Sequence, residues 1–338
     1  MGPVIRNKTG YYYYFLTFIE KPCHRLRSID YPSFLDAILR YNRQRMNIKY
    51  NVMNKSKPLF FLMLFALSVN TAVLGQTSKP LYTAPLGVEG YTFRKSFPIS
   101  VAKTLDTIKM FGFTELEGGG NMMPPDEFRK LCDERGISIP STGAGYDELV
   151  KSPDSVIYRA KIYGSAYVMC AWIPHENGVL TFENAKKAVE DFNRVGKLLK
   201  EQGLIFCYHA HGYEFQPYEN WYLLDYIFAN TNPEYVSFEM DVFWMQFGGG
   251  DPVALLKKYG NRWKLVHLKD MRKGTIKNLT GLTSTENDVP LGTGEVDIPG
   301  ILREAKKIGI RHYFIEDESN DVNEHVAQSI LYLKSLKE

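Results

Sequence analysis

From about residue 82 onward, short apolar runs alternate with longer amphipathic segments, and this alternation restricts the chain to few folds. Eight runs have the length and composition of buried β-strands: 86–93, 113–118, 136–141, 165–172, 204–211, 235–241, 263–270 and 312–318. Helical patterns at 99–112, 125–136, 184–203, 251–260 and 297–309 lie between runs, and each ends in glycine, which favours a left-handed helix cap. Eight strand–helix units in about 255 residues predict a single (β/α)8 TIM barrel over residues 80–338.

An open doubly wound sheet is the alternative to the barrel, because it also alternates strands and helices. Such a sheet usually has a glycine-rich phosphate turn after its first strand. Here the GGGN at 118–121 follows the second run and lacks the GxGxxG spacing. The GGGDP at 248–252 instead predicts a helix start, with Asp251 as N-cap and Pro252 in the first turn.

The segment from Met53 to Gly75 has the pattern of an export signal. Lys55 and Lys57 precede an apolar run of about ten residues, which is too short to span a bilayer. We therefore expect cleavage before Gln76 and a periplasmic or secreted protein that meets a membrane only through this signal; a buried helix is the alternative. Residues 1–52 then come from an over-extended reading frame or form a poorly ordered extension.

Charge and cysteine content exclude other classes. Of the formal net charge of +3, residues 1–75, with eleven Lys or Arg and three Asp or Glu, contribute +8, so the remaining residues carry −5. An acidic body does not favour a nucleic-acid partner. Cys132, Cys170 and Cys207 lie far apart without a CxxC motif, so we expect small buried side chains and no zinc knuckle.

Charged and imidazole side chains end several of the apolar runs. They are Glu117 in the second run, His209 and His211 in the fifth, Asp241 in the sixth, His267 and Lys269 in the seventh, and Glu316 in the eighth. A barrel gathers the carboxyl ends of its strands at one mouth, where active sites lie. Such groups are costly to bury unless they are paired or coordinated.

Four of these residues form a candidate set of metal ligands, namely His209, Asp241, His267 and Glu316. Two imidazoles and two carboxylates suit Mn²⁺, Zn²⁺, Co²⁺ or Fe²⁺ better than Ca²⁺, which prefers oxygen ligands. Ion pairs at the barrel mouth are the alternative for Asp241 or Glu316 taken singly.

The segments YHAHGYEF (208–215), VPLGTGEVDIPGILREAKKIG (289–309) and YFIEDE (313–318), together with the stretch 238–271, resemble the sugar phosphate isomerase/epimerase group of xylose isomerase-like barrels. The resemblance implies metal ligands on strands five to eight in the order Glu, Asp, His, Glu. His209 stands where many relatives have Glu, so His211 or Glu214 could supply the fifth-strand ligand instead. The histidine that relatives often have near Gly143 is also missing.

Membership would imply metal-assisted proton abstraction next to a carbonyl, through an enediolate. The candidate bases are Glu117, His211, Lys269 and Glu316, and the resemblance favours Glu316 in a double role as base and ligand. Lys269 could instead neutralise the enediolate.

The predicted export signal favours a small non-phosphorylated sugar or glycoside as the substrate. We expect an isomerase or epimerase; β-elimination on a 3-keto-glycoside and a non-catalytic sugar-binding barrel are the alternatives. Candidate faces for sugar stacking are Trp172, Tyr213, Phe243 and Trp244, which core packing would explain as well. The sequence is compatible with an oligomer.

Overall fold

The computed structural model describes residues 78–120 and 122–338. The predicted extension over residues 1–52 and the predicted export signal over 53–75 lie outside these residues. Within the described part of the chain, no helix is long and apolar enough to cross a membrane.

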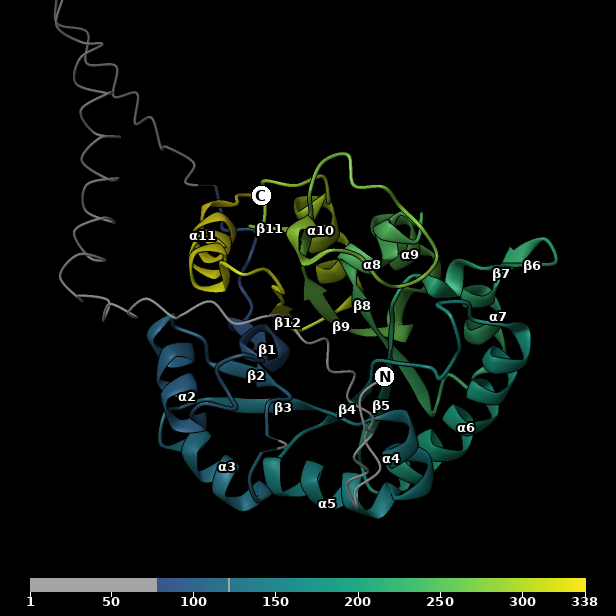
Figure 1. The fold of residues 1–338 in the computed structure, drawn as a ribbon, viewed down its shortest axis with the longest axis horizontal. Helices are drawn as coiled ribbons and strands as arrows, with labels where there is room; N and C mark the ends of the chain where they lie inside the picture. The colour runs from purple at the N-terminus through teal and green to yellow at the C-terminus, as the bar shows by residue number, and fades with distance from the viewer. Residues whose placement is uncertain (1–77, 121) are drawn as a thin grey trace, which may run out of the picture. The chain divides into compact units, whose positions relative to one another are not determined.

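Eight parallel strands close into a barrel, which confirms the predicted fold (Figure 1). Each strand coincides with one of the eight apolar runs, and only β3 extends beyond its run, by two residues. The strands are β1 (Gly87–Glu89), β2 (Glu115–Glu117), β3 (Ser138–Gly143), β4 (Tyr167–Cys170), β5 (Ile205–Ala210), β8 (Val236–Asp241), β9 (Trp263–Leu268) and β12 (His312–Ile315). The strands pair in chain order, and β1 closes the barrel by pairing with both β2 and β12. All eight carboxyl ends therefore meet at one mouth.

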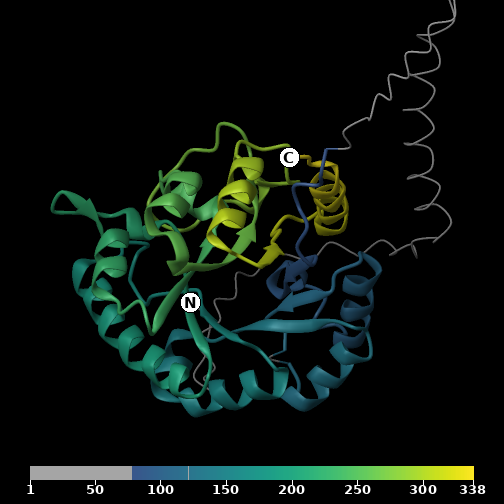
Figure 2. The same ribbon diagram turned by 180° about the vertical axis from the view of Figure 1, so that it is seen from behind.

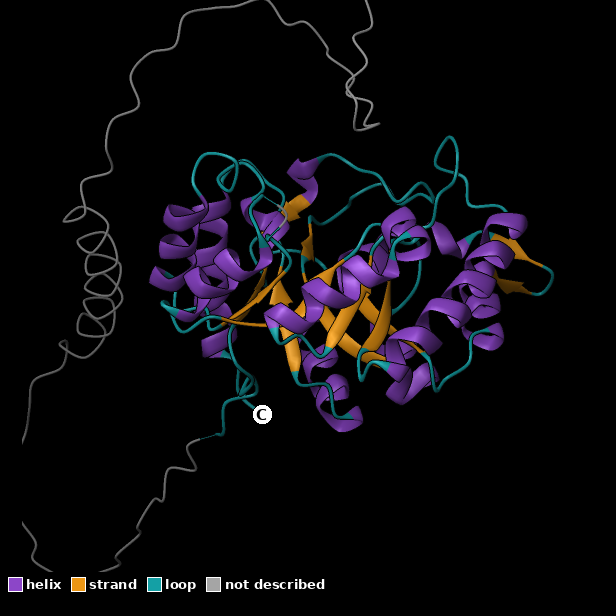
Figure 3. Cartoon of the chain, turned by 90° about the horizontal axis from the view of Figure 1, so that it is seen from below, coloured by secondary structure: helices purple, strands orange, loops and turns teal. Residues whose placement is uncertain are grey.

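Helices surround this barrel, as the views from the front, from behind and from below all show (Figures 1, 2 and 3). Five correspond to the helical patterns in the sequence: α2 (Val101–Met110), α3 (Pro125–Asp133), α6 (Phe182–Glu201), α9 (Pro252–Tyr259) and α10 (Ile298–Ile308). Five more follow other segments: α4 (Tyr146–Lys151), α5 (Pro153–Tyr163), α7 (Leu223–Asn230), α8 (Val242–Phe247) and α11 (Val322–Ser335). The N-cap prediction for α9 is confirmed, since Asp251 accepts hydrogen bonds from the backbone N–H groups of Val253 and Ala254.

Two apolar layers hold the barrel together. The larger core packs the helices against the outside of the strands. A smaller cluster of Cys207, Leu265 and Phe314, with Tyr167 against it, joins strands β4, β5, β9 and β12. Cys132, Cys170 and Cys207 are buried free thiols, as expected. The cluster of Cys207, Leu265, Phe314 and Tyr167 fills the barrel, so polar groups nearer the carboxyl ends of the strands lie above an apolar layer.

Candidate metal centre at the barrel mouth

Three of the four predicted metal ligands meet at the carboxyl ends of β5, β8 and β9. Asp241 and His267 occupy paired positions on β8 and β9, and His209 lies on the neighbouring strand β5. One ligand atom from each of these residues lies within 4.8 Å of the others, and all three side chains are buried. Parallel pairing of adjacent strands brings these side chains together from positions far apart in the sequence.

The cluster has two ligand atoms that nothing in the described protein satisfies. His209 Nε2 and Asp241 Oδ2 are buried without a hydrogen-bond partner and lie 3.9 Å apart. Asp241 Oδ2 also lies 4.0 Å from His267 Nδ1. Atoms that share one ion with bonds of about 2.1 Å lie no more than about 4.2 Å apart. The unpaired atoms and their spacing therefore fit a single divalent ion.

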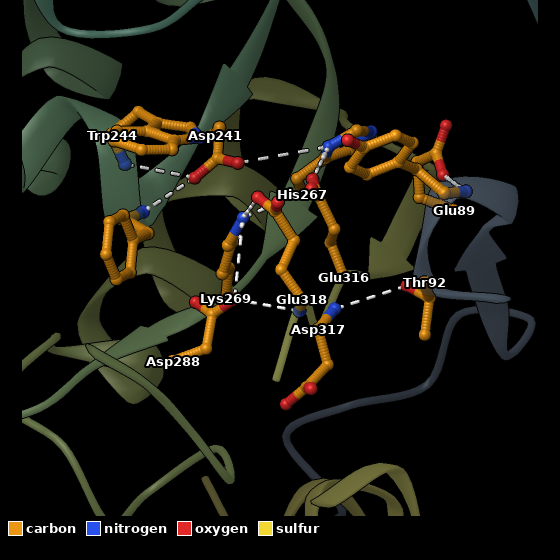
Figure 4. Close-up of polar contacts among 12 residues, drawn as sticks. Glu89, Thr92, Asp241, Trp244, His267, Lys269, Asp288, Glu316, Asp317 and Glu318 are labelled. Atoms are coloured by element: carbon orange, nitrogen blue, oxygen red, sulfur yellow. Dashed lines mark hydrogen bonds and ion pairs between the residues drawn. The ribbon is translucent and has the colours of Figure 1, made fainter. Parts of the chain in front are cut away.

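The local backbone fixes the orientation of the Asp241 side chain. It is the N-cap of α8, and its Oδ1 accepts hydrogen bonds from the backbone N–H groups of Phe243 (2.8 Å) and Trp244 (3.1 Å). Because Oδ1 is held by the helix, Oδ2 is left to face His267, as Figure 4 shows, and it also lies near His209 Nε2. Burial raises the pKa of Asp241 to about 7, while Lys269 acts in the opposite direction. A bound cation would likewise favour the carboxylate form.

The two histidines have opposite electrostatic surroundings. Burial, followed by the neighbouring His267, lowers the pKa of His209 to about 3, so its imidazole is neutral and available to a metal. Burial alone would lower the pKa of His267 too, but the Glu239 and Glu117 carboxylates outweigh it and hold that pKa well above its ordinary value. Since a metal ligand must be deprotonated, an ion at this centre would replace a proton on His267.

Glu316, the fourth predicted ligand, lies beside the cluster of three. It follows β12, and its Oε2 hydrogen-bonds to His267 Nδ1 at 2.7 Å, while its Oε1 accepts from Lys269 Nζ at 3.1 Å. Burial would raise its pKa, but Lys269 and then His267 outweigh that effect and hold the pKa well below its ordinary value. Glu316 is therefore an ionised carboxylate at the edge of the centre.

Two fully buried carboxylates lie behind the ligands. Glu239 places Oε2 3.2 Å from His209 Nδ1 and Oε1 3.3 Å from His267 Nε2. Glu117 Oε2 lies 2.5 Å from the same His267 Nε2. Both contacts engage the nitrogens that face away from Asp241 Oδ2, which fixes the orientation of each ring. Glu117, predicted as a base, thus lies on the opposite edge of the His267 ring from Glu316.

Glu117, Glu239 and His267 also form a second compact group of possible ligand atoms. Glu117 Oε1 and Glu239 Oε1 in this group are also buried without a hydrogen-bond partner, and His267 is hydrogen-bonded to Glu117 through Nε2 and to Glu316 through Nδ1. The cavity beside the strand ends distinguishes the two groups, because His209 and His267 line it whereas Glu117 and Glu239 do not. Access from this cavity therefore favours the group of His209, Asp241 and His267 as the metal position.

Replacing Glu239 by glutamine is expected to weaken metal binding, because His209 Nδ1 would lose the carboxylate that it contacts and His267 Nε2 would keep only Glu117. Loss of such an outer partner typically lowers metal affinity about 10–100-fold. Competition with a fluorescent chelator measures this affinity directly. Glu115→Gln, which removes a strand carboxylate that pairs with His312 instead, is the matched control and should bind the ion as tightly as the wild type. Equal affinities for Glu239→Gln and Glu115→Gln would contradict the assigned role.

Lys269 is a buried cation with three carboxylate neighbours. Its Nζ lies 2.5 Å from Glu318 Oε1, 3.1 Å from Glu316 Oε1 and 3.8 Å from Asp288 Oδ2. Burial would lower its pKa, but these carboxylates, Asp288 first, outweigh burial and hold the pKa well above its ordinary value. A permanently charged ammonium suits the predicted role of neutralising negative charge and does not suit the alternative role of base.

A cavity of about 300 Å³ opens beside the metal centre. Its walls include His209, His267 and Glu316 from the centre, His211 and Trp172 from loops, and Trp244 from α8. Trp172 keeps 36% of its surface exposed, whereas Trp244 is 6% exposed. Two of the four aromatic residues predicted to stack on a sugar therefore line the cavity.

The other two predicted aromatic residues lie elsewhere. Tyr213 is fully buried, and its hydroxyl lies 3.0 Å from the Tyr208 hydroxyl and accepts from the backbone N–H of Ile173. Phe243 lines a smaller neighbouring cavity of about 80 Å³, under the ammonium of Lys269. Tyr213 thus packs behind the cavity wall, and Phe243 packs beside it.

Of the three possible fifth-strand ligands, the structure brings His209 into the cluster. Glu214 is fully buried and hydrogen-bonds to the Tyr208 hydroxyl and the backbone N–H of His211. His211 lies on the cavity wall with its Nδ1 unpartnered, and burial, followed by His209, lowers its pKa well below the ordinary value. A neutral imidazole facing the cavity can bind a substrate hydroxyl.

Sequence reasoning missed several residues of this site. They are Glu239 behind the histidines and Glu89, Tyr91, Leu282 and Glu318 on the cavity wall. A signal existed for Glu239, because it precedes Asp241 by two positions on a strand and therefore shares its face. Glu89 also ends a strand, but the apolar run that contains it continues to Phe93.

Comparison with known proteins places this geometry in a family. The family model described as xylose isomerase-like TIM barrel matches residues 87–336. This range contains all eight barrel strands and every residue of the metal centre. The chain therefore belongs to the xylose isomerase-like TIM-barrel family, and the resemblance inferred from the sequence is confirmed.

Individual relatives are distant. A 103-residue segment, 30% of this chain, is 37% identical to an inosose dehydratase of Clostridium tetani and spans about a third (34%) of that protein. A sugar phosphate isomerase/epimerase of Parabacteroides distasonis has a similar structure, with a TM-score of 0.60 and 24% identity over 78% of this chain and 97% of that one. An IolI protein with a bound zinc atom gives a TM-score of 0.59 and 15% identity over 74% and 98% of the two chains. The two structures establish the shared fold.

Proposed function

We propose that this protein is a metal-dependent enzyme that removes a proton from a carbon next to a carbonyl in a sugar-like substrate, and that β-elimination follows. The observation that carries the proposal is the pair of unpaired ligand atoms, His209 Nε2 and Asp241 Oδ2, buried beside a cavity that an ionised Glu316 also lines. A dehydratase or a 3-keto-glycoside lyase would use this arrangement.

His209, Asp241 and His267 would hold the ion, with Glu316 as the nearest further ligand. The bound ion would polarise the substrate carbonyl and stabilise the negative charge that forms on its oxygen. The zinc in the structurally similar IolI protein supports a divalent metal, and Mn²⁺, Co²⁺ and Fe²⁺ remain the other candidates.

Glu316 is the proposed base. It is ionised, it lies against His267, and it lines the cavity that would hold the substrate. Lys269 donates a hydrogen bond to Glu316 and so holds the carboxylate in place while adding positive charge near the reacting atoms. Glu117 and Glu239 are positioning residues in this proposal, since both contact only the far sides of the imidazoles.

The side chain at the end of the fifth barrel strand, β5, favours elimination over epimerisation. Two-base epimerisation needs a second ionised carboxylate on the opposite face of the substrate, and β5 supplies the neutral imidazole of His209 at this position. The partial match to an inosose dehydratase supports elimination independently. Isomerisation remains the second candidate, because one base can return its proton to a neighbouring carbon.

The cavity favours a substrate without phosphate. Among the described residues, its lining includes the carboxylates of Glu316 and Glu318 and the carboxyl group of Glu89, and it contains no lysine or arginine. A phosphate dianion would be repelled there. This supports the proposal of a neutral sugar or glycoside, stacked against Trp172 and Trp244, and agrees with the proposed export, which N-terminal sequencing of the native protein would test.

The decisive experiment follows hydrogen exchange in D₂O. Protein stripped of metal and reloaded with Mn²⁺ should label the carbon next to the carbonyl of a 3-keto-glycoside or an inosose and release the glycosidic alcohol or water. Exchange with formation of an isomer, without release, would favour the isomerase. Binding without any exchange would refute an enzymatic role and favour a sugar-binding barrel.

A further inference from the structure

Glu89 is a second carboxyl group in the same cavity, and its surroundings differ from those of Glu316. It ends β1, is 8% exposed and lines the cavity with Glu316. Its Oε2 accepts a hydrogen bond from the backbone N–H of Tyr91, while its Oε1 has no hydrogen bond within the described part of the chain. A nearly buried carboxyl group that lines the cavity thus has one oxygen without a hydrogen-bond partner among the described residues.

His267 acts to lower the pKa of Glu89, but Lys269, the other buried cation of the site within the described residues, lies away from Glu89. Lys269 contacts Glu316, Glu318 and Asp288, and it lies on the opposite side of Glu316 from Glu89 in Figure 4. Over residues 78–120 and 122–338, no lysine, arginine or histidine forms an ion pair with Glu89. A buried carboxyl without a cation favours its neutral, protonated form.

The electrostatic surroundings move the two carboxyl groups in opposite directions. Burial, and then the Glu316 carboxylate, raises the pKa of Glu89 well above its ordinary value. Glu316 has different contacts in the same cavity, because it accepts a hydrogen bond from Lys269 and hydrogen-bonds to His267. A buried carboxyl group without an ion-pair partner and a carboxylate paired with a lysine, in one cavity, have the surroundings of an acid and a base.

We infer that Glu89 is the proton donor to the leaving oxygen of the substrate, a catalytic role that rests on the proposed elimination. Glu316 takes the proton from the carbon next to the carbonyl, and the electron pair of that C–H bond becomes the new C=C bond. The bond from the neighbouring carbon to the leaving oxygen breaks, and the Glu89 O–H supplies the proton that makes this oxygen an alcohol or water. A proton must then return from Glu316 to Glu89 before the next turnover.

Leaving groups that need different amounts of acid assistance test this role. We would compare a methyl 3-keto-glucoside with the 4-nitrophenyl 3-keto-glucoside, because methoxide needs a proton to depart and nitrophenolate does not. In Glu89→Gln, release of methanol should fall about 10²–10⁴-fold, the usual contribution of a general acid, whereas release of nitrophenol should fall less than tenfold. Deuterium exchange at the carbon next to the carbonyl should persist in recovered methyl substrate.

Other outcomes separate this inference from the proposed function. Equal losses for both substrates in Glu89→Gln, or no loss for either, would overturn the donor role. A wild-type protein that neither exchanges nor releases a leaving group would instead refute the elimination itself. Glu115→Gln on β2, outside the cavity, is the matched control and should behave as the wild type does. If Glu89→Gln fails to fold, the wild type still tests the role. Proton donation to the leaving oxygen should make the wild-type protein release methanol and nitrophenol at nearly the same rate, although the two leaving groups differ greatly in acidity.

Discussion

Glu316→Gln is expected to abolish deuterium exchange at the substrate carbon, with a loss of about 10²–10⁴-fold. Glutamine keeps the shape of the side chain and can still accept a hydrogen bond from Lys269, but it cannot take a proton. Exchange measured by NMR in D₂O with saturating Mn²⁺ reports this step without requiring product release. The loss should exceed that in Glu89→Gln, which keeps the base.

The control for this variant is Glu304→Gln on α10, where a nearly buried glutamate pairs with Lys307 far from the cavity. Its exchange rate should match that of the wild type. Metal content must be compared as well, because Glu316 also borders the ion. A Glu316→Gln protein that holds a full equivalent of metal and still exchanges at more than a tenth of the wild-type rate would contradict the assignment of Glu316 as base.

The barrel could be predicted from the sequence because its signals are local and repeated. Each strand is an apolar run that turn residues separate from a helix, and the predicted helices are followed by glycines such as Gly203 and Gly309 that have positive φ values. Once the number of strand–helix units reaches eight, parallel closure is the natural solution. The same rule predicts that His209, Asp241 and His267 lie at one mouth.

The second layer of the site could be predicted only in part, because it depends on contacts across the barrel. Glu117 meets His267 although 150 positions separate them, and their distance follows from barrel curvature and side-chain length. The position of the Tyr213 ring could not be predicted from the sequence either. It follows Gly212, whose positive φ of 85° turns the chain and directs the ring behind the cavity wall. Apolar patterns show that such a ring is buried, but not which cavity it faces.

His267→Ala is expected to lose the ion altogether and to destabilise the metal-free protein by about 3–5 kcal/mol, the typical result of removing one partner from a buried ionic cluster. His267 contributes one of the three clustered ligand atoms, and it also pairs with Glu117, Glu239 and Glu316. Mass spectrometry of metals in purified protein measures the first effect. Urea unfolding in the presence of EDTA measures the second for both proteins in the same metal-free state.

The stability of the metal-free His267→Ala protein should also depend on pH. Burial already raises the pKa of Glu117 to about 6, while hydrogen bonding to His267 acts to lower it, so the variant should have a higher value still. A group whose pKa is raised by folding destabilises the protein as pH rises above its unfolded value. The metal-free His267→Ala protein should therefore lose stability between pH 5 and pH 8, as Glu117 loses its proton. The wild type also loses stability over this range, because the raised pKa of His267 contributes stability that is present below its unfolded value of about 6.5 and is lost as the pH rises. His312→Ala, which removes the partner of Glu115 at the other end of the barrel, should keep its ion and follow the pH dependence of the wild type. A metal-replete His267→Ala protein would show that His209 and Asp241 do not share their ion with β9, and the proposed centre would then be wrong.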